Sequence, residues 1–232
     1  MQAKYSLWTA IVSGLVACSA GEESAAERAA DPTGGADSRP VVLFVGTSLT
    51  AGYGLDPDEA FPALIQRKID SAGLRFRVVN AGVSGETSAG ALRRMDWLFE
   101  REPPAVVVIE TGANDGLRGQ NLDTLRQNLE AIIALARERN PAPHVVLLAM
   151  EALPNMGRDY VTRFRAVYPE VARVTGVTLV PFFLVDVAGV DSLNQPDGIH
   201  PTRRGQALVT ERVWVGLEPV LREGEKGRER AR

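Results

Sequence analysis

The sequence predicts a three-layer α/β/α sandwich built on a five-stranded parallel sheet, and two observations support this prediction. First, five continuous apolar runs of strand length, rich in valine and isoleucine, alternate with segments of helical spacing between Pro40 and Leu221. Second, such alternation implies parallel strands joined by right-handed crossovers, with helices on both faces of the sheet. The expected strands are 41–45, 75–80, 105–111, 144–150 and 177–183.

Five segments between and after these strands are expected to be helices. The segment 121–140 is the clearest, because its leucines and isoleucines fall on one face at helical spacing. Asp58 is the expected N-cap of the first helix, and Pro169 is expected to bend the fourth. The five helices are expected at about 58–72, 87–101, 121–140, 158–173 and 202–220.

The N-terminal residues 1–17 are predicted to be a lipoprotein-type signal peptide. A lone Lys4 precedes the apolar stretch Leu7–Ala17, which is too short to span a membrane. This stretch ends in the letters LVAC, which resemble a bacterial lipoprotein box, and Cys18 is the only cysteine of the chain. Cys18 is therefore the predicted lipidation site. Residues 18–39 lack large apolar side chains, so they are expected to form a flexible tether.

A lipid on Cys18 predicts a protein held on a membrane of the bacterial cell envelope and facing the periplasm. Ser19, which follows the cysteine, favours the outer membrane over the inner one. Cleavage after a small residue such as Ala20 is the alternative, and it would release a soluble periplasmic or secreted protein. At the other end, residues 222–232 are charged and are expected to form a solvated tail beyond the domain at 40–221.

Composition excludes several classes of function. A net charge of −3 without a basic stripe gives no indication of a nucleic-acid partner. One cysteine rules out disulfides within the chain and cysteine-rich zinc sites. The only histidines are His144 and His200, there is no H-E-x-x-H motif, and neither a P-loop nor a dinucleotide fingerprint is present. We therefore expect neither a metal nor an organic cofactor.

The expected sheet directs attention to the residues that follow each strand, because ligands bind at the carboxyl ends of parallel strands. Ser48 follows the first run, within GTSLTAGYG. A serine hydroxyl is a weak nucleophile unless an imidazole accepts its proton and an acceptor holds the imidazole. The stretch DGIHP provides Asp197 and His200, although by itself it reads as a turn before a helix. His144 precedes a strand at the opposite edge, which favours a structural role.

Acyl transfer also needs hydrogen-bond donors directed at the oxyanion of the tetrahedral intermediate. Asn114, in TGANDG after the third run, offers a carboxamide. The backbone N–H groups of Ser48 and of Gly85, in NAGVSGETSAG after the second run, are further candidates. Taken alone, the asparagine favours an Asx-turn and the glycine favours a tight turn over a catalytic role.

In combination, GTSL, NAGVSGET, GAND and DGIHP resemble the four sequence blocks of the SGNH hydrolases, also called GDSL esterases and lipases. The stretches TSLTAGYGL, NDGLRG and DGIHP are similar to the bacterial arylesterase, acyl-CoA thioesterase and lysophospholipase subgroup. The resemblance implies a flavodoxin-like SGNH hydrolase fold. It further implies Ser48 as nucleophile, His200 as base and Asp197 as the residue that orients His200. Ser48, Gly85 and Asn114 are implied as the oxyanion hole.

The sequence departs from the family pattern at two positions. Thr47 stands where the family name has aspartate, and Ala113 where many members have glycine. Neither position belongs to the implied triad or oxyanion hole, so the departures leave the chemistry intact and the substrate details open.

The expected function is hydrolysis of carboxylic (acyl) esters through an acyl-enzyme, with thioesters and lysophospholipids as further candidate substrates. Leu117, Leu153 and Met156 are expected near the site and favour acyl chains. One alternative is a carbohydrate O-acetyl esterase that uses the same triad. Another is a catalytically silent lipoprotein that binds an envelope component. An α/β-hydrolase is disfavoured because the G-x-S-x-G elbow is absent.

Overall fold

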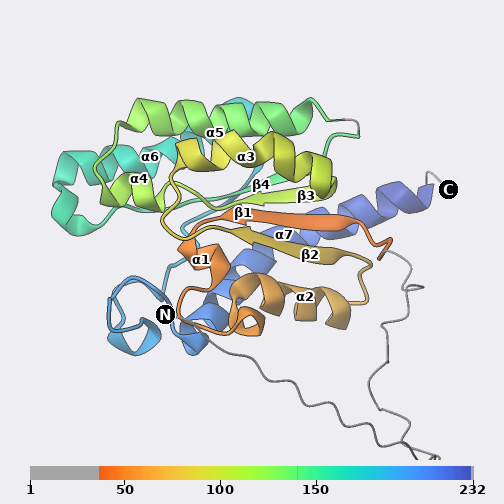
Figure 1. The fold of residues 1–232 in the computed structure, drawn as a ribbon, viewed down its shortest axis with the longest axis horizontal. Helices are drawn as coiled ribbons and strands as arrows, with labels where there is room; N and C mark the ends of the chain where they lie inside the picture. The colour runs from red at the N-terminus through yellow and green to blue at the C-terminus, as the bar shows by residue number, and fades with distance from the viewer. Residues whose placement is uncertain (1–36, 140, 231–232) are drawn as a thin grey trace, which may run out of the picture. The chain divides into compact units, whose positions relative to one another are not determined.

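The computed structural model describes residues 37–139 and 141–230, and in this part of the chain it confirms the predicted five-stranded parallel sheet between layers of helices (Figure 1). The strand order is β2-β1-β3-β4-β5, and every neighbouring pair is parallel. The strands are β1 (Val41–Gly46), β2 (Arg77–Gly82), β3 (Pro104–Ile109), β4 (His144–Leu148) and β5 (Thr178–Val180).

Helices cover both faces of the sheet, with α3, α5 and α6 on one side and α2 and α7 on the other (Figure 1). On the first side α5 packs between α3 and α6, and on the second α2 packs against α7. The helices are α1 (Ser48–Ala51), α2 (Phe61–Ser71), α3 (Ser88–Arg101), α4 (Ala113–Leu117), α5 (Leu122–Arg137), α6 (Arg158–Thr175) and α7 (Arg203–Arg230). Three single turns of 3₁₀-helix are η1 (Pro57–Glu59), η2 (Pro154–Met156) and η3 (Asp191–Leu193).

The middle of the sheet forms the core. Every residue of β1 is buried, and so is every residue of β3 except Ala105. Both strands are covered by helices on two faces, which explains why their sequences are continuously apolar rather than alternating. β2 lies at the edge of the sheet and is only partly buried. The buried centre therefore holds the carboxyl ends of β1 and β3 in fixed positions side by side.

At two helix ends the difference from the sequence expectation has a local cause. Asp58 is not the N-cap of the first long helix: Asp56 caps the short turn η1, and α2 begins after Ala60. The last helix was expected to end near Val220 but continues to Arg230. Glutamate, lysine and arginine are good helix formers, so a charged segment without apolar residues can extend a helix that is already anchored.

The predicted tail at 222–232 thus contains the last turns of α7, and Arg228 and Glu225 in these turns contact residues outside the helix. The Arg228 guanidinium lies 4.3 Å from the centre of the Phe76 ring. The Glu225 carboxylate accepts a hydrogen bond of 3.1 Å from the backbone N–H of Arg75.

The predicted signal peptide at 1–17, the lipidation site Cys18 and nearly all of the tether at 18–39 lie outside the described residues. Within 37–139 and 141–230, none of the helices combines the length and the apolar character that crossing a membrane requires.

Candidate active site

Ser48 is the first residue of α1, directly beyond the carboxyl end of β1. Thr47 is the N-cap of this helix, with its hydroxyl accepting a hydrogen bond of 3.4 Å from the backbone N–H of Leu49. The preceding residue, Gly46, must be small, because a Cβ atom there would collide with the side chain of Thr50. The abrupt change from buried strand to tight helical turn therefore presents the serine at the edge of the sheet.

The structure brings Ser48, His200 and Asp197 into one hydrogen-bonded series. Nε2 of His200 lies 2.9 Å from Oγ of Ser48, and Nδ1 lies 2.7 Å from Oδ2 of Asp197. The other carboxylate oxygen of Asp197 accepts hydrogen bonds of 3.0 Å from the backbone N–H groups of Ile199 and His200. Gly198 has a φ of +76°, the left-handed conformation that this tight loop requires.

The same contacts decide the charge of Asp197. Partial burial raises the pKa of this carboxyl group, but the hydrogen bonds from the His200 side chain and from the backbone N–H groups of His200 and Ile199 outweigh it and hold the pKa at about 2. An ionised carboxylate favours the imidazole tautomer that carries its proton on Nδ1. Nε2 is then free to accept a proton from Ser48.

Tyr53 packs against the imidazole and Gln195 holds the backbone around it, and sequence reasoning missed both. The Tyr53 and His200 rings pack with their centres 4.5 Å apart. The Gln195 backbone N–H donates to the carbonyl of His200 at 2.7 Å, and the Gln195 side chain donates to the carbonyls of Tyr53 and Pro201. Tyr53 lies in the TSLTAGYGL stretch, but nothing local in the sequence links it to residue 200.

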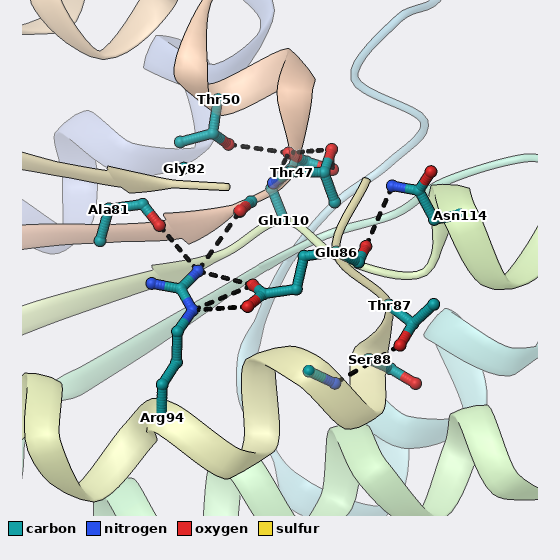
Figure 2. Close-up of polar contacts among 12 residues, drawn as sticks. Thr47, Thr50, Ala81, Gly82, Glu86, Thr87, Ser88, Arg94, Glu110 and Asn114 are labelled. Carbon is teal, nitrogen blue, oxygen red and sulfur yellow. Dashed lines mark hydrogen bonds and ion pairs between the residues drawn. The ribbon is translucent and has the colours of Figure 1, made fainter. Parts of the chain in front are cut away.

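The candidate oxyanion donors line the same cavity as Ser48 and His200. Gly85 lies in the turn between β2 and α3 with a φ of +78°, and Asn114 lies in α4. Within the described part of the chain, neither the Ser48 nor the Gly85 backbone N–H donates a hydrogen bond. One N–H of the Asn114 carboxamide donates to the Glu86 carbonyl at 3.0 Å (Figure 2). The second N–H is therefore available to a ligand.

Two polar contacts hold the loops that carry these donors, and neither was predicted from the sequence. The Arg94 and Glu86 side chains form an ion pair with an Nη2–Oε2 distance of 2.6 Å, and Arg94 also donates to the Ala81 carbonyl at 2.7 Å (Figure 2). In α4, the Asp115 carboxylate accepts from the backbone N–H of Ser88 at 2.8 Å and from its hydroxyl at 2.6 Å. The two donor-bearing loops are thus both fixed to α3, one through Arg94 and the other through Ser88.

A cavity of about 590 Å³ opens beside Ser48, and most of its lining is apolar. The expectation that Leu117 and Leu153 lie near the site is met. Met156 is not among the lining residues, because it lies in the turn η2 with its methyl group toward Gly119. Other apolar lining residues are Leu49, Val161, Phe182 and Leu184.

The cavity lining includes one ion pair, between Arg165 and Glu151, with an Nη2–Oε2 distance of 2.8 Å. His144, the other histidine of the chain, is the first residue of β4 and so lies at the opposite edge of the sheet. Within 37–139 and 141–230, no group of three or more histidine, cysteine, aspartate or glutamate side chains is arranged to hold a metal ion.

A serine, a histidine and an aspartate in hydrogen-bonded series, beside backbone and amide donors, is the arrangement that serine hydrolases use. Residues 44–208 match the GDSL-like Lipase/Acylhydrolase family. The chain belongs to this family.

Named relatives agree with this assignment. The chain is 44% identical over 180 residues to "Esterase TesA" of Pseudomonas aeruginosa, covering 78% of this chain and 89% of the relative. It is 36% identical over 180 residues to "Thioesterase 1/protease 1/lysophospholipase L1" of Escherichia coli, covering 78% and 84%. The crystal structure of the psychrotrophic esterase EstA from Pseudoalteromonas sp. superposes with a TM-score of 0.74 at 35% identity, covering 78% of this chain and 98% of that one. The protein is accordingly a carboxylic ester hydrolase.

Proposed function

We propose that the protein hydrolyses acyl esters through a covalent intermediate on Ser48. As Oγ attacks the ester carbonyl carbon, Nε2 of His200 takes the hydroxyl proton, and the proton then passes to the leaving alcohol or thiol as the ester bond breaks. Water attacks the acyl-enzyme in the same way, returning the proton to Oγ as the acid departs. The observation that carries this proposal is the series of contacts of 2.9 Å and 2.7 Å that joins the three side chains.

Asp197 has an electrostatic role in this mechanism. Because its pKa is about 2, its carboxylate stays ionised while the imidazolium forms, and it stabilises that charge without taking the proton. The negative charge that develops on the substrate oxygen is proposed to be stabilised by the N–H groups of Ser48, Gly85 and Asn114. Removal of one such donor typically costs about 10²–10³ in kcat.

The lining of the cavity supports an acyl chain as the group held beside Ser48. A carbohydrate acetyl ester would leave this apolar surface unused, which argues against the O-acetyl esterase alternative. Each methylene group that a longer chain buries is worth about 0.8 kcal/mol. We therefore expect kcat/KM to rise by about fourfold per added methylene until the cavity is full. The name of the Escherichia coli relative supports thioesters and lysophospholipids as further substrates.

Initial rates on p-nitrophenyl esters of two to sixteen carbons, with an acyl thioester and a lysophospholipid alongside, test this proposal. Ser48→Ala is expected to lose at least 10³-fold in kcat, because residual catalysis would come only from the donors and binding. Ser71→Ala is the matched control, since Ser71 is the last residue of α2 and its hydroxyl donates a hydrogen bond to the carbonyl of Arg67. A wild-type protein that binds these compounds without turnover would favour the silent lipoprotein, whereas a Ser48→Ala variant with normal rates would overturn the assignment of Ser48 as the nucleophile.

We also propose that Cys18 carries a lipid that holds the enzyme on the periplasmic side of a bacterial envelope membrane. The support is the LVAC sequence after a short apolar stretch and the absence of another cysteine. One acyl chain gives only reversible binding, so the diacylglycerol and N-acyl groups of a lipoprotein would be needed for a stable anchor. Metabolic labelling with radioactive palmitate should mark the wild-type protein and not Cys18→Ser; equal labelling would contradict this proposal.

A further inference from the structure

Glu110 is a buried carboxylate next to the candidate active site that the proposed mechanism does not use. It follows the last residue of β3, and its backbone N–H donates to the carbonyl of Val45 at 2.8 Å. Its side chain is 1% exposed and is not part of the cavity lining. A buried carboxylate is costly unless its oxygens are hydrogen-bonded, so the position of its partners is informative.

Within the part of the chain that the structure describes, all hydrogen bonds to the Glu110 side chain come from Thr47 and Thr50, one residue before and two residues after Ser48. The Thr47 backbone N–H donates to Oε2 at 2.8 Å, and the Thr47 hydroxyl lies 3.1 Å from Oε1 and 3.0 Å from Oε2. The Thr50 hydroxyl donates to Oε2 at 2.8 Å. Figure 2 shows both threonine side chains directed at this carboxylate. The Glu110 carboxylate thus holds both the N-cap and the first turn of α1, the helix that begins with Ser48.

The packing leaves this turn little freedom to relax. A Cβ atom at Gly46 would collide with Thr50 and would also lie 2.8 Å from Oε2 of Glu110. A Cβ atom at Gly82 would collide with the backbone of Ala51, at the other end of α1. The ends of β1 and β2 therefore confine the turn, and the Glu110 carboxylate, which follows β3, accepts the hydrogen bonds of the two threonines in it.

The surroundings make the charge of Glu110 sensitive to pH. Burial raises the pKa of Glu110 to about 7, with the hydrogen bonds from the two threonines opposing this rise. On the α3 side, Arg94 donates to the Gly46 carbonyl at 3.4 Å but is paired with Glu86. On the α6 side lies Tyr168, a buried phenol whose own pKa is raised by burial, with smaller contributions from Asp115 and from Glu110. His200 faces Ser48 from the cavity side.

We propose that ionised Glu110 is a positioning residue, which holds the Thr47–Thr50 turn so that the hydroxyl and the backbone N–H of Ser48 stay aligned for attack. This inference rests on the proposed role of Ser48. A carboxylate accepts from every donor in the turn, whereas a protonated carboxyl group adds an O–H that must itself find an acceptor. Protonation would therefore force a threonine hydroxyl to reverse and would loosen the turn.

The proposal also explains what threonine achieves at position 47. An aspartate there would set a second carboxylate against Glu110, and two such groups in one site cannot both ionise easily. A threonine hydroxyl can donate to the ionised form. Thr47 thus permits a charged Glu110 without a second negative charge beside the nucleophile.

The experiment uses Glu110→Gln in the full chain, because glutamine keeps the shape of the side chain but cannot carry the charge. The rate of labelling by a fluorophosphonate and the final labelled fraction are measured together with kcat and KM. We expect kcat per labelled site to fall at least tenfold with KM changed by less than threefold. A merely structural residue would lower the labelled fraction and leave kcat per labelled site unchanged, which would overturn the proposal.

The pH profile gives a second readout. If catalysis requires ionised Glu110 in addition to the base, the acid side of the log kcat/KM profile is steeper by one unit of slope in the wild type than in Glu110→Gln. An equal slope in both proteins would contradict the proposal.

If Glu110→Gln does not fold, Thr50→Val tests the same point. Loss of one donor destabilises the ionised carboxylate, so the acid limb should move to higher pH; no movement, or movement to lower pH, would count against the proposal. Failure of the proposed function itself would be recognised separately, because Ser48→Ala would then remain active.

Discussion

The stability of the folded protein should depend on pH through Glu110, and Glu110→Gln isolates this dependence. The pKa of this carboxyl group is about 7 in the folded protein, against an ordinary value of 4.5. Between these two values the unfolded chain has lost the proton and the folded protein has kept it. The stabilising contribution is therefore complete below pH 4.5 and is lost as the pH rises through 7. Burial is the cause, because it penalises the charged form.

The difference between the two pKa values corresponds to about 3 kcal/mol of unfolding free energy. This is a large part of the total stability of an ordinary domain. Glutamine does not titrate, so the Glu110→Gln variant does not lose this unfolding free energy as the pH rises. We expect the unfolding free energy of Glu110→Gln, relative to the wild type, to increase by about 3 kcal/mol between pH 4.5 and pH 8.

Urea unfolding of the two proteins at half-unit pH intervals measures this difference. The ionisations that both proteins share cancel in the comparison, which leaves the contribution of residue 110. Parallel profiles, or a variant that loses stability relative to the wild type as the pH rises, would refute the assignment of a raised pKa to Glu110.

Three further outcomes are expected. Asn114→Ala should lower kcat by about 10²–10³ with little change in KM, since the second N–H of its amide is proposed to bind the developing oxyanion and not the ground-state substrate; a rise in KM alone, measured by steady-state kinetics, would contradict this. Asp197→Asn should lower kcat by about 10⁴, to the same extent throughout pH 5–8. The reason is that a pKa of about 2 keeps the wild-type carboxylate ionised over that range. A loss that disappears toward pH 5 would show that the low pKa of Asp197 is wrong. Arg94→Met should cost about 1–3 kcal/mol in urea unfolding by leaving the half-buried Glu86 carboxylate and the Ala81 carbonyl without their donor, and a loss below about 0.5 kcal/mol would mean that the pair is not needed.

The fold could be predicted from the sequence because buried parallel strands leave a local pattern. Continuous apolar runs located all five strands, but not their ends. The strand expected at 177–183 ends at Val180, directly before Pro181, which has no N–H to continue the ladder. The last helix runs ten residues beyond the expected Val220, because its charged turns contact a neighbouring segment that sequence spacing does not reveal.

The candidate site could likewise be predicted only in part. Serine, histidine, asparagine and glycine after strand ends lie in recognisable local stretches, and the structure places Ser48, Gly85, Asn114 and His200 on one cavity. The supporting contacts join residues that are distant in sequence, such as Arg94 and the end of β1, and no local sequence pattern indicates them. Glu110 did leave a signal: it is a carboxylate within a run expected to be buried, and such a residue requires partners.

The most direct test of the mechanism is to trap the acyl-enzyme. The protein is mixed with a p-nitrophenyl ester, quenched in acid within the first turnover, digested and analysed by mass spectrometry. We predict that the acyl mass is found on Ser48 in the wild type and on no residue in Ser48→Ala. An acyl group on any other residue during turnover, or rapid hydrolysis by Ser48→Ala, would contradict the central claim.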